Sequence, residues 1–119
     1  MTSDGTSLQH TVLDNLATFL SVDKLKELLA RYLADSQQIL IRLDAALSEQ
    51  NTAEASRLVH SLISISAHVG ALQISELAKS LEDLAQEEKF DDIRAQMSNL
   101  SQLFDRTRGD IEQLDFMQG

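Results

Sequence analysis

The chain contains no proline in its 119 residues, and this absence restricts the fold more than any other feature of the sequence. Proline is the strongest helix breaker, so only four glycines remain as strong interruptions. Runs of β-branched residues, which favour strands, are few. Little therefore interrupts a helix between residues 7 and 115, and we expect an all-α protein.

Length and composition predict one folded domain. The chain is long enough for a single core and too short for two. Its 43% hydrophobic and 24% charged residues are typical of a soluble globular protein. We expect residues 7–119 to form one helical-bundle domain, and the small polar residues 1–6 to be flexible.

Charge and residue usage exclude several classes of function. The net charge of −9 makes nucleic acid and anionic membrane surfaces poor partners. Without cysteine there are no disulfides, thiolate metal sites or cysteine nucleophiles. The three histidines lack the i, i+4 spacing of a helical zinc site, so we expect neither a metal nor a cofactor in this chain.

The sequence also lacks signals for export or membrane insertion. No apolar run approaches the roughly 20 residues that span a bilayer. The first ten residues, MTSDGTSLQH, have neither the basic nor the apolar region of a secretory signal. We expect a cytoplasmic location, either as a free-standing protein or as a module of a larger one.

The spacing of apolar residues predicts five helices. The first spans about residues 7–20, with Leu8, Val12, Leu16 and Phe19 on one side. The others span about 23–49, 51–68 and 71–87, and a fifth after Lys89 carries a seam of Ile93, Met97, Leu100, Phe104, Ile111 and Leu114. Short joints favour an antiparallel up-down four-helix bundle that the first helix caps. The seam fits a core, although a homodimeric coiled coil uses the same pattern.

The expected helix boundaries carry their own signals. Ser21 and Asp23 offer side-chain oxygens to cap the second helix. Asn51 and Glu54 form a pair like a capping box at the start of the third helix. Gly70 tolerates the backbone angles that end a helix, so it marks the joint between the third and fourth helices.

One histidine of the third helix faces away from the expected core. At 100° per residue, its apolar residues lie within an arc of about 80°, and His60 points in nearly the opposite direction. Those apolar residues are Ala55, Leu58, Leu62, Ile65 and Val69, and the neighbours of His60 on the helix surface are Ser56, Arg57, Ile63, Ser64 and Ala67. A titratable nucleophile among mostly small side chains suggests a docking surface with chemistry at its centre.

A hairpin at Gly70 would place Glu82 or Ser80 across from His60, to within about one helical turn. A carboxylate there would accept the Nδ1 proton and leave Nε2 as the free nucleophile.

The pattern resembles the histidine-containing phosphotransfer (Hpt) family over about residues 8–115. The residues that carry the resemblance are His60, Leu62, Gly70, Ala71, Leu81 and Glu82. It implies that His60 accepts a phosphoryl group from a receiver-domain aspartyl phosphate and passes it to another receiver. Hybrid sensor histidine kinases and response regulators are then the expected partners, and the receiver supplies Mg²⁺.

The resemblance also implies roles for the neighbours of His60. Glu82 would orient the imidazole and Arg57 would contact phosphoryl oxygens, while Ser56, Arg57, Ile63, Ser64 and Ala67 would contact the receiver. The protein would be a phosphocarrier without autonomous catalysis, and we expect a monomer. Glu82 and Arg57 also fit the plainer interpretation of surface charges.

The chain departs from the family pattern at one point. Many members have lysine-glycine where this chain has Ile63 and Ser64, and that lysine usually stabilises the phosphoryl group. An exposed Ile63 would also suit an alternative function, that of a non-catalytic binding module that docks a receiver or kinase without phosphotransfer. A purely structural helical bundle is a third interpretation.

Overall fold

The structure, a computed structural model, describes residues 7–118, and within that range the chain is helical and has no strand. The all-helical prediction is therefore confirmed. The predicted flexibility of residues 1–6 concerns residues outside the described range. The elements are α1 (His10–Ala17), α2 (Val22–Ser48), α3 (Thr52–His68), α4 (Leu72–Gln86), α5 (Phe90–Glu112) and a short 3-10 helix, η1 (Asp115–Met117).

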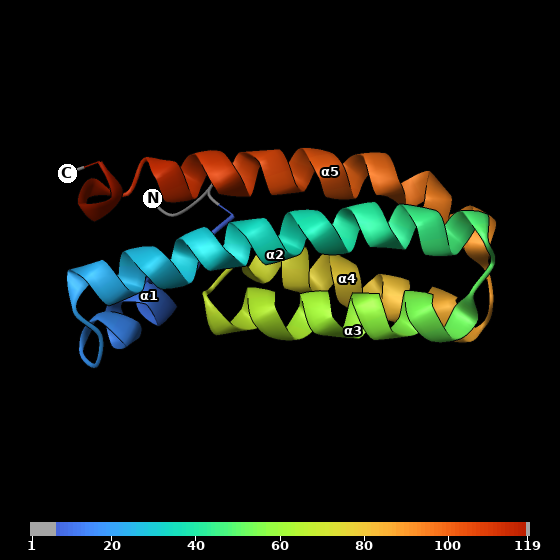
Figure 1. Ribbon diagram of the computed structural model, residues 1–119, viewed down its shortest axis with the longest axis horizontal. Coiled ribbons are helices and arrows are strands. Elements are labelled where there is room, and N and C mark those ends of the chain that lie inside the picture. Colours follow the sequence, from blue (N-terminus) through green and yellow to red (C-terminus); the bar gives the residue numbers. More distant parts are fainter. Residues whose placement is uncertain (1–6, 119) are drawn as a thin grey trace.

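The four longer helices lie lengthwise beside one another, and consecutive ones run in alternating directions (Figure 1). Contacts join α2 to both α3 and α5, and α4 to the same two helices, so the four surround a shared interior. The molecule measures 43 × 28 × 20 Å. The predicted seam of α5 faces this interior, where Ile93, Leu100, Phe104 and Ile111 are buried within the single chain.

Apolar residues form two buried clusters along the length of the bundle. The larger one includes Leu43, Leu58, Leu62, Leu81 and Leu100. The smaller one lies at the end closed by α1 and η1, and contains Leu8, Leu13, Leu25, Leu29, Tyr32, Val69, Ala71 and Ile111. Because residues of α3 contribute to the larger cluster and residues at its C-terminal end to the smaller one, α3 has a buried face along its whole length.

Side-chain caps begin two of the helices as the sequence predicts. Ser21 Oγ accepts a hydrogen bond from the backbone N–H of Lys24 at 3.2 Å. Asn51 Oδ1 accepts one from the backbone N–H of Glu54 at 3.1 Å. Each bond satisfies a donor that the first turn of a helix leaves free.

The joints after α2, α3 and α4 share one backbone conformation. Gln50, Gly70 and Glu88 adopt positive φ angles of 52°, 84° and 58°. After each, an amide bonds back five residues, as in Ala71 N–H to Ser66 O at 2.8 Å, the pattern that closes a helix C-terminus. Gly70 is the predicted joint, whereas the other two use ordinary residues.

The first helix is shorter than predicted, and Phe19, which was expected on its apolar side, lies beyond its end. Helix α1 ends at Ala17 because the chain turns through residues 18–20 to enter α2. The helical period stops there, and Phe19 is 85% exposed. Leu13 is instead the buried residue of α1.

Candidate functional site

Helix α3 carries His60 on the side toward α4, where its side chain is open to solvent. The predicted core residues Ala55, Leu58, Leu62 and Val69 are buried, and Ile65 is half-buried. The His60 side chain is 71% exposed. The helical period thus places the imidazole at the surface, where another molecule can reach it.

The structure brings Glu82 to His60. Helix α4 returns antiparallel to α3 after Gly70, and His60 Nδ1 lies 3.1 Å from Glu82 Oε2. An ionised carboxylate offers only acceptors, so this bond requires a proton on Nδ1, and in the neutral imidazole the lone pair then lies on Nε2. Ser80, the other residue considered for this position, instead donates to Leu77 O of its own helix at 2.6 Å.

Arg57 lies one turn before His60 but is engaged elsewhere. Its guanidinium makes two hydrogen bonds with the Glu54 carboxylate, at 2.9 and 2.8 Å. These bonds lower the pKa of Glu54 and raise that of Arg57. Arg57 also lines a groove of about 350 Å³ between α2 and α3, together with Arg42. Its side chain is therefore directed to the α2 side of α3, and not toward Glu82.

The expectation that Ile63 is exposed is wrong. Ile63 is half-buried and packs against the larger core cluster. The buried face of α3 is wider than predicted because the helix packs against both α2 and α4, and Val59 and Ser66 are buried as well. Of the other predicted contact residues, Ser64 and Ala67 are exposed and Ser56 is half-buried.

Neither a metal site nor a membrane span is evident in the described residues. No three His, Asp or Glu side chains between residues 7 and 118 gather closely enough to hold a metal ion. None of the helices in that range has the length and apolar content needed to cross a bilayer.

The family model for the Hpt domain matches residues 27–115 of the chain. This protein belongs to the Hpt family. Its match with the crystal structure of histidine-containing phosphotransfer protein B (HptB) from Pseudomonas aeruginosa PAO1 has a TM-score of 0.89 at 23% identity. The alignment covers 98% of this chain and 99% of that one, and at such identity it shows a shared fold. No curated protein matches the sequence.

Hpt proteins are phosphocarriers rather than catalysts, and they interact with receiver domains and kinases of two-component systems. The family match therefore supports a histidine phosphotransfer role in a phosphorelay. In this Hpt domain, Ile63 places a half-buried aliphatic side chain where many members have a lysine. The site thus has no cation at that position.

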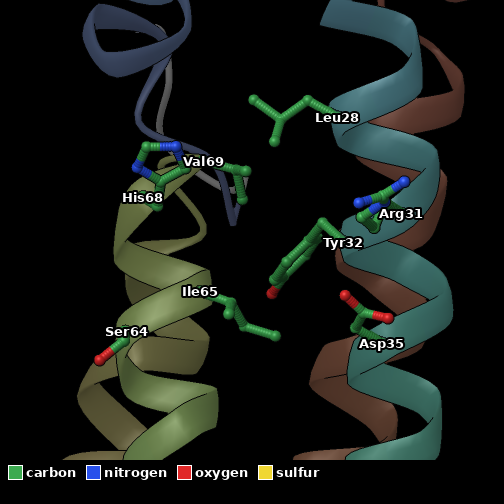
Figure 2. A pocket seen from close by; sticks show the side chains of 8 residues that line it. All are labelled: Leu28, Arg31, Tyr32, Asp35, Ser64, Ile65, His68 and Val69. Carbon is green, nitrogen blue, oxygen red and sulfur yellow. The ribbon is translucent and has the colours of Figure 1, made fainter.

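A second groove of this Hpt domain was not predicted from the sequence. It has a volume of about 380 Å³ and runs between α2 and α3. Figure 2 shows Tyr32 lying between the two helices, and its lining residues are Leu28, Arg31, Tyr32, Asp35, Ser64, Ile65, His68 and Val69. Because it follows the α2 side of α3, the groove is separate from the His60–Glu82 pair on the α4 side.

Tyr32 forms a buried polar contact beneath this groove. Its hydroxyl lies 2.8 Å from Ser66 Oγ, and both residues are almost completely buried. Burial raises the pKa of Tyr32, and the bond with Ser66 opposes that effect. The single tyrosine within the apolar repeat of α2 was the sequence feature that could have indicated this contact, because a buried phenol requires a hydrogen-bond partner.

Proposed function

We propose that this Hpt protein is a phosphorelay intermediate that carries the phosphoryl group on Nε2 of His60. The observation that carries the proposal is the exposed imidazole with Nδ1 3.1 Å from the Glu82 carboxylate. The geometry leaves one ring nitrogen with a free lone pair at the surface.

The transfer step follows from this arrangement. Nε2 attacks the phosphorus of a receiver aspartyl phosphate, a bond forms between Nε2 and phosphorus, and the bond between phosphorus and the aspartyl oxygen breaks. The electron pair leaves with the aspartate carboxylate, and the ring gains a positive charge shared with its Nδ1–H. Glu82 stabilises that charge. The reverse step delivers the phosphoryl group to a second receiver.

The receiver supplies the rest of the chemistry in this proposal. Phosphoryl transfer depends mainly on positioning and charge stabilisation. Mg²⁺ and its carboxylate ligands would come with the receiver, while the exposed Ser64 and Ala67 leave room for it beside His60. Ser56 and Arg57 would border the same contact surface.

We interpret the fold as an antiparallel up-down four-helix bundle of α2–α5 with α1 as a cap, acting as a monomer in one domain. Burial of the α5 seam within one chain supports the monomer. A cytoplasmic location follows from the need for phosphoryl groups that derive from ATP. The alternative of a non-catalytic binding module gains less support from Ile63 than the sequence predicted, because that side chain is half-buried.

The test is incubation with a radiolabelled, phosphorylated receiver domain, repeated for each receiver encoded in the same genome. We expect an acid-labile, alkali-stable label on the wild type and none on His60→Gln. His68→Gln is the matched control, because His68 is also exposed on α3 and should leave labelling unchanged. A wild type that stays unlabelled with every receiver would refute the proposal.

A further inference from the structure

A phosphoryl group on His60 would add negative charge to a site that already holds a carboxylate. The protein carries a net charge of −9, and Glu82 lies 3.1 Å from the ring. A nearby cation would offset the repulsion between these groups. Helices α3 and α4 carry two lysine or arginine residues between them, Arg57 and Lys79.

These two cations differ in how firmly they are held. Arg57 makes two short hydrogen bonds to Glu54. Lys79 makes a single 3.3 Å contact with Glu76, and the two side chains are 56% and 70% exposed. Exposed pairs of this kind contribute little free energy, so the ammonium group can exchange partners readily.

The register of the α3–α4 hairpin places Lys79 on α4 within one helical turn of the level of His60. Glu82 meets His60, and nearer the Gly70 turn Ser75 Oγ donates to Ile63 O at 3.2 Å. Lys79 lies between these two contacts along α4. It is three residues from Glu82, which places the two on adjoining parts of one helix face.

We propose that Lys79 binds the phosphoryl oxygens of phosphorylated His60, exchanging its contact with Glu76 for the new anion. This inference rests on His60 being the phosphoacceptor. Lys79 supplies from α4 the positive charge that α3 lacks at Ile63. Because it attracts anions to the site, it also favours the approach of an anionic phosphoryl donor.

The test uses phosphoramidate, a small anionic donor whose P–N bond breaks with release of ammonia as the Nε2–P bond forms. Loading is followed by 31P NMR on the full chain, and the signal absent from His60→Gln identifies His60. We expect Lys79→Gln to load about two- to fivefold more slowly at low salt. The difference should disappear in 0.5 M NaCl, and Lys79→Arg should restore most of the rate. Lys24→Gln, which removes an exposed lysine also paired at i, i+3, is the matched control and should load like the wild type.

A second variant tests the exchange of partners. Glu76→Gln releases Lys79 and should speed loading, whereas Glu76→Gln combined with Lys79→Gln should lose that gain. Equal loading rates for wild type and Lys79→Gln at low salt would overturn the role of Lys79. An equal loss of loading rate in Lys24→Gln would do the same, and neither result would affect the proposed function. A wild-type His60 that takes no phosphoryl group from phosphoramidate or from any phosphorylated receiver would overturn both this inference and the proposed function.

Discussion

Replacing Gly70 by alanine should destabilise the protein strongly, because two independent costs meet at this joint. Its φ of 84° is a left-handed conformation, which costs an alanine about 1–2 kcal/mol. A Cβ there would also lie 2.8 Å from the carbonyl oxygen of Gln9 and 3.0 Å from Val12 Cβ. Relief of that contact requires the segment before α1 to move away.

The movement has its own cost. The Gln9 N–H donates to Gly70 O at 2.6 Å, and loss of this bond adds about 1 kcal/mol. The two contributions sum to about 2–3 kcal/mol, which lowers the melting temperature of a domain of this size by roughly 8–12 °C.

Urea denaturation and thermal melting followed by circular dichroism would measure this effect. Gly109→Ala is the matched control, because a Cβ at Gly109 meets nothing within 4 Å and the residue lies inside α5. That variant should gain about 0.5–1 kcal/mol from helix propensity. A loss below about 1 kcal/mol for Gly70→Ala, or the same sign of change in both variants, would refute the reasoning.

Three further predictions concern the surface, the buried phenol and the site. Phe19→Ser should change the free energy of unfolding by less than about 0.5 kcal/mol, whereas Leu13→Ala should lower it by about 2–4 kcal/mol. Comparable losses of both variants in urea titrations would contradict the exposure of Phe19. Burial raises the pKa of Tyr32 above 10.0, so the folded state keeps the phenolic proton longer and stability falls as pH rises above 10. Tyr32→Phe should show a shallower fall over that range, and identical slopes would count against it. Glu82→Gln should slow transfer from a phosphorylated receiver about fivefold, since the loss of a partly exposed charge pair costs about 1 kcal/mol. An unchanged single-turnover rate would show that Glu82 has no part in the mechanism.

The periodic features of the chain were predictable. Helix periodicity is local, so the spacing of Leu58, Leu62 and Val69 was enough to predict a buried face and an outward His60. Caps at Ser21 and Asn51 were predictable for the same reason, because each cap and its partner lie three residues apart. The register of a hairpin is nearly local too, and it narrowed the residue across from His60 to Glu82 or Ser80, of which the structure shows Glu82.

Other features depend on which helices meet, and the sequence does not contain that information in any local form. The joints at Gln50 and Glu88 carry no glycine, so their positive φ angles gave no signal. Ile63 was expected to be exposed, because one helical wheel cannot show that α3 packs against two neighbours.

By itself, the sequence determined the helical class, the boundaries of the long helices and the outward position of His60, because backbone propensity and the 3.6-residue period act over a few residues. Only the tertiary structure decided the width of the buried face of α3 and the exposure of Phe19. Burial depends on the helices that pack around a residue. Those helices are distant from one another in the sequence, so burial does not follow from spacing along the chain.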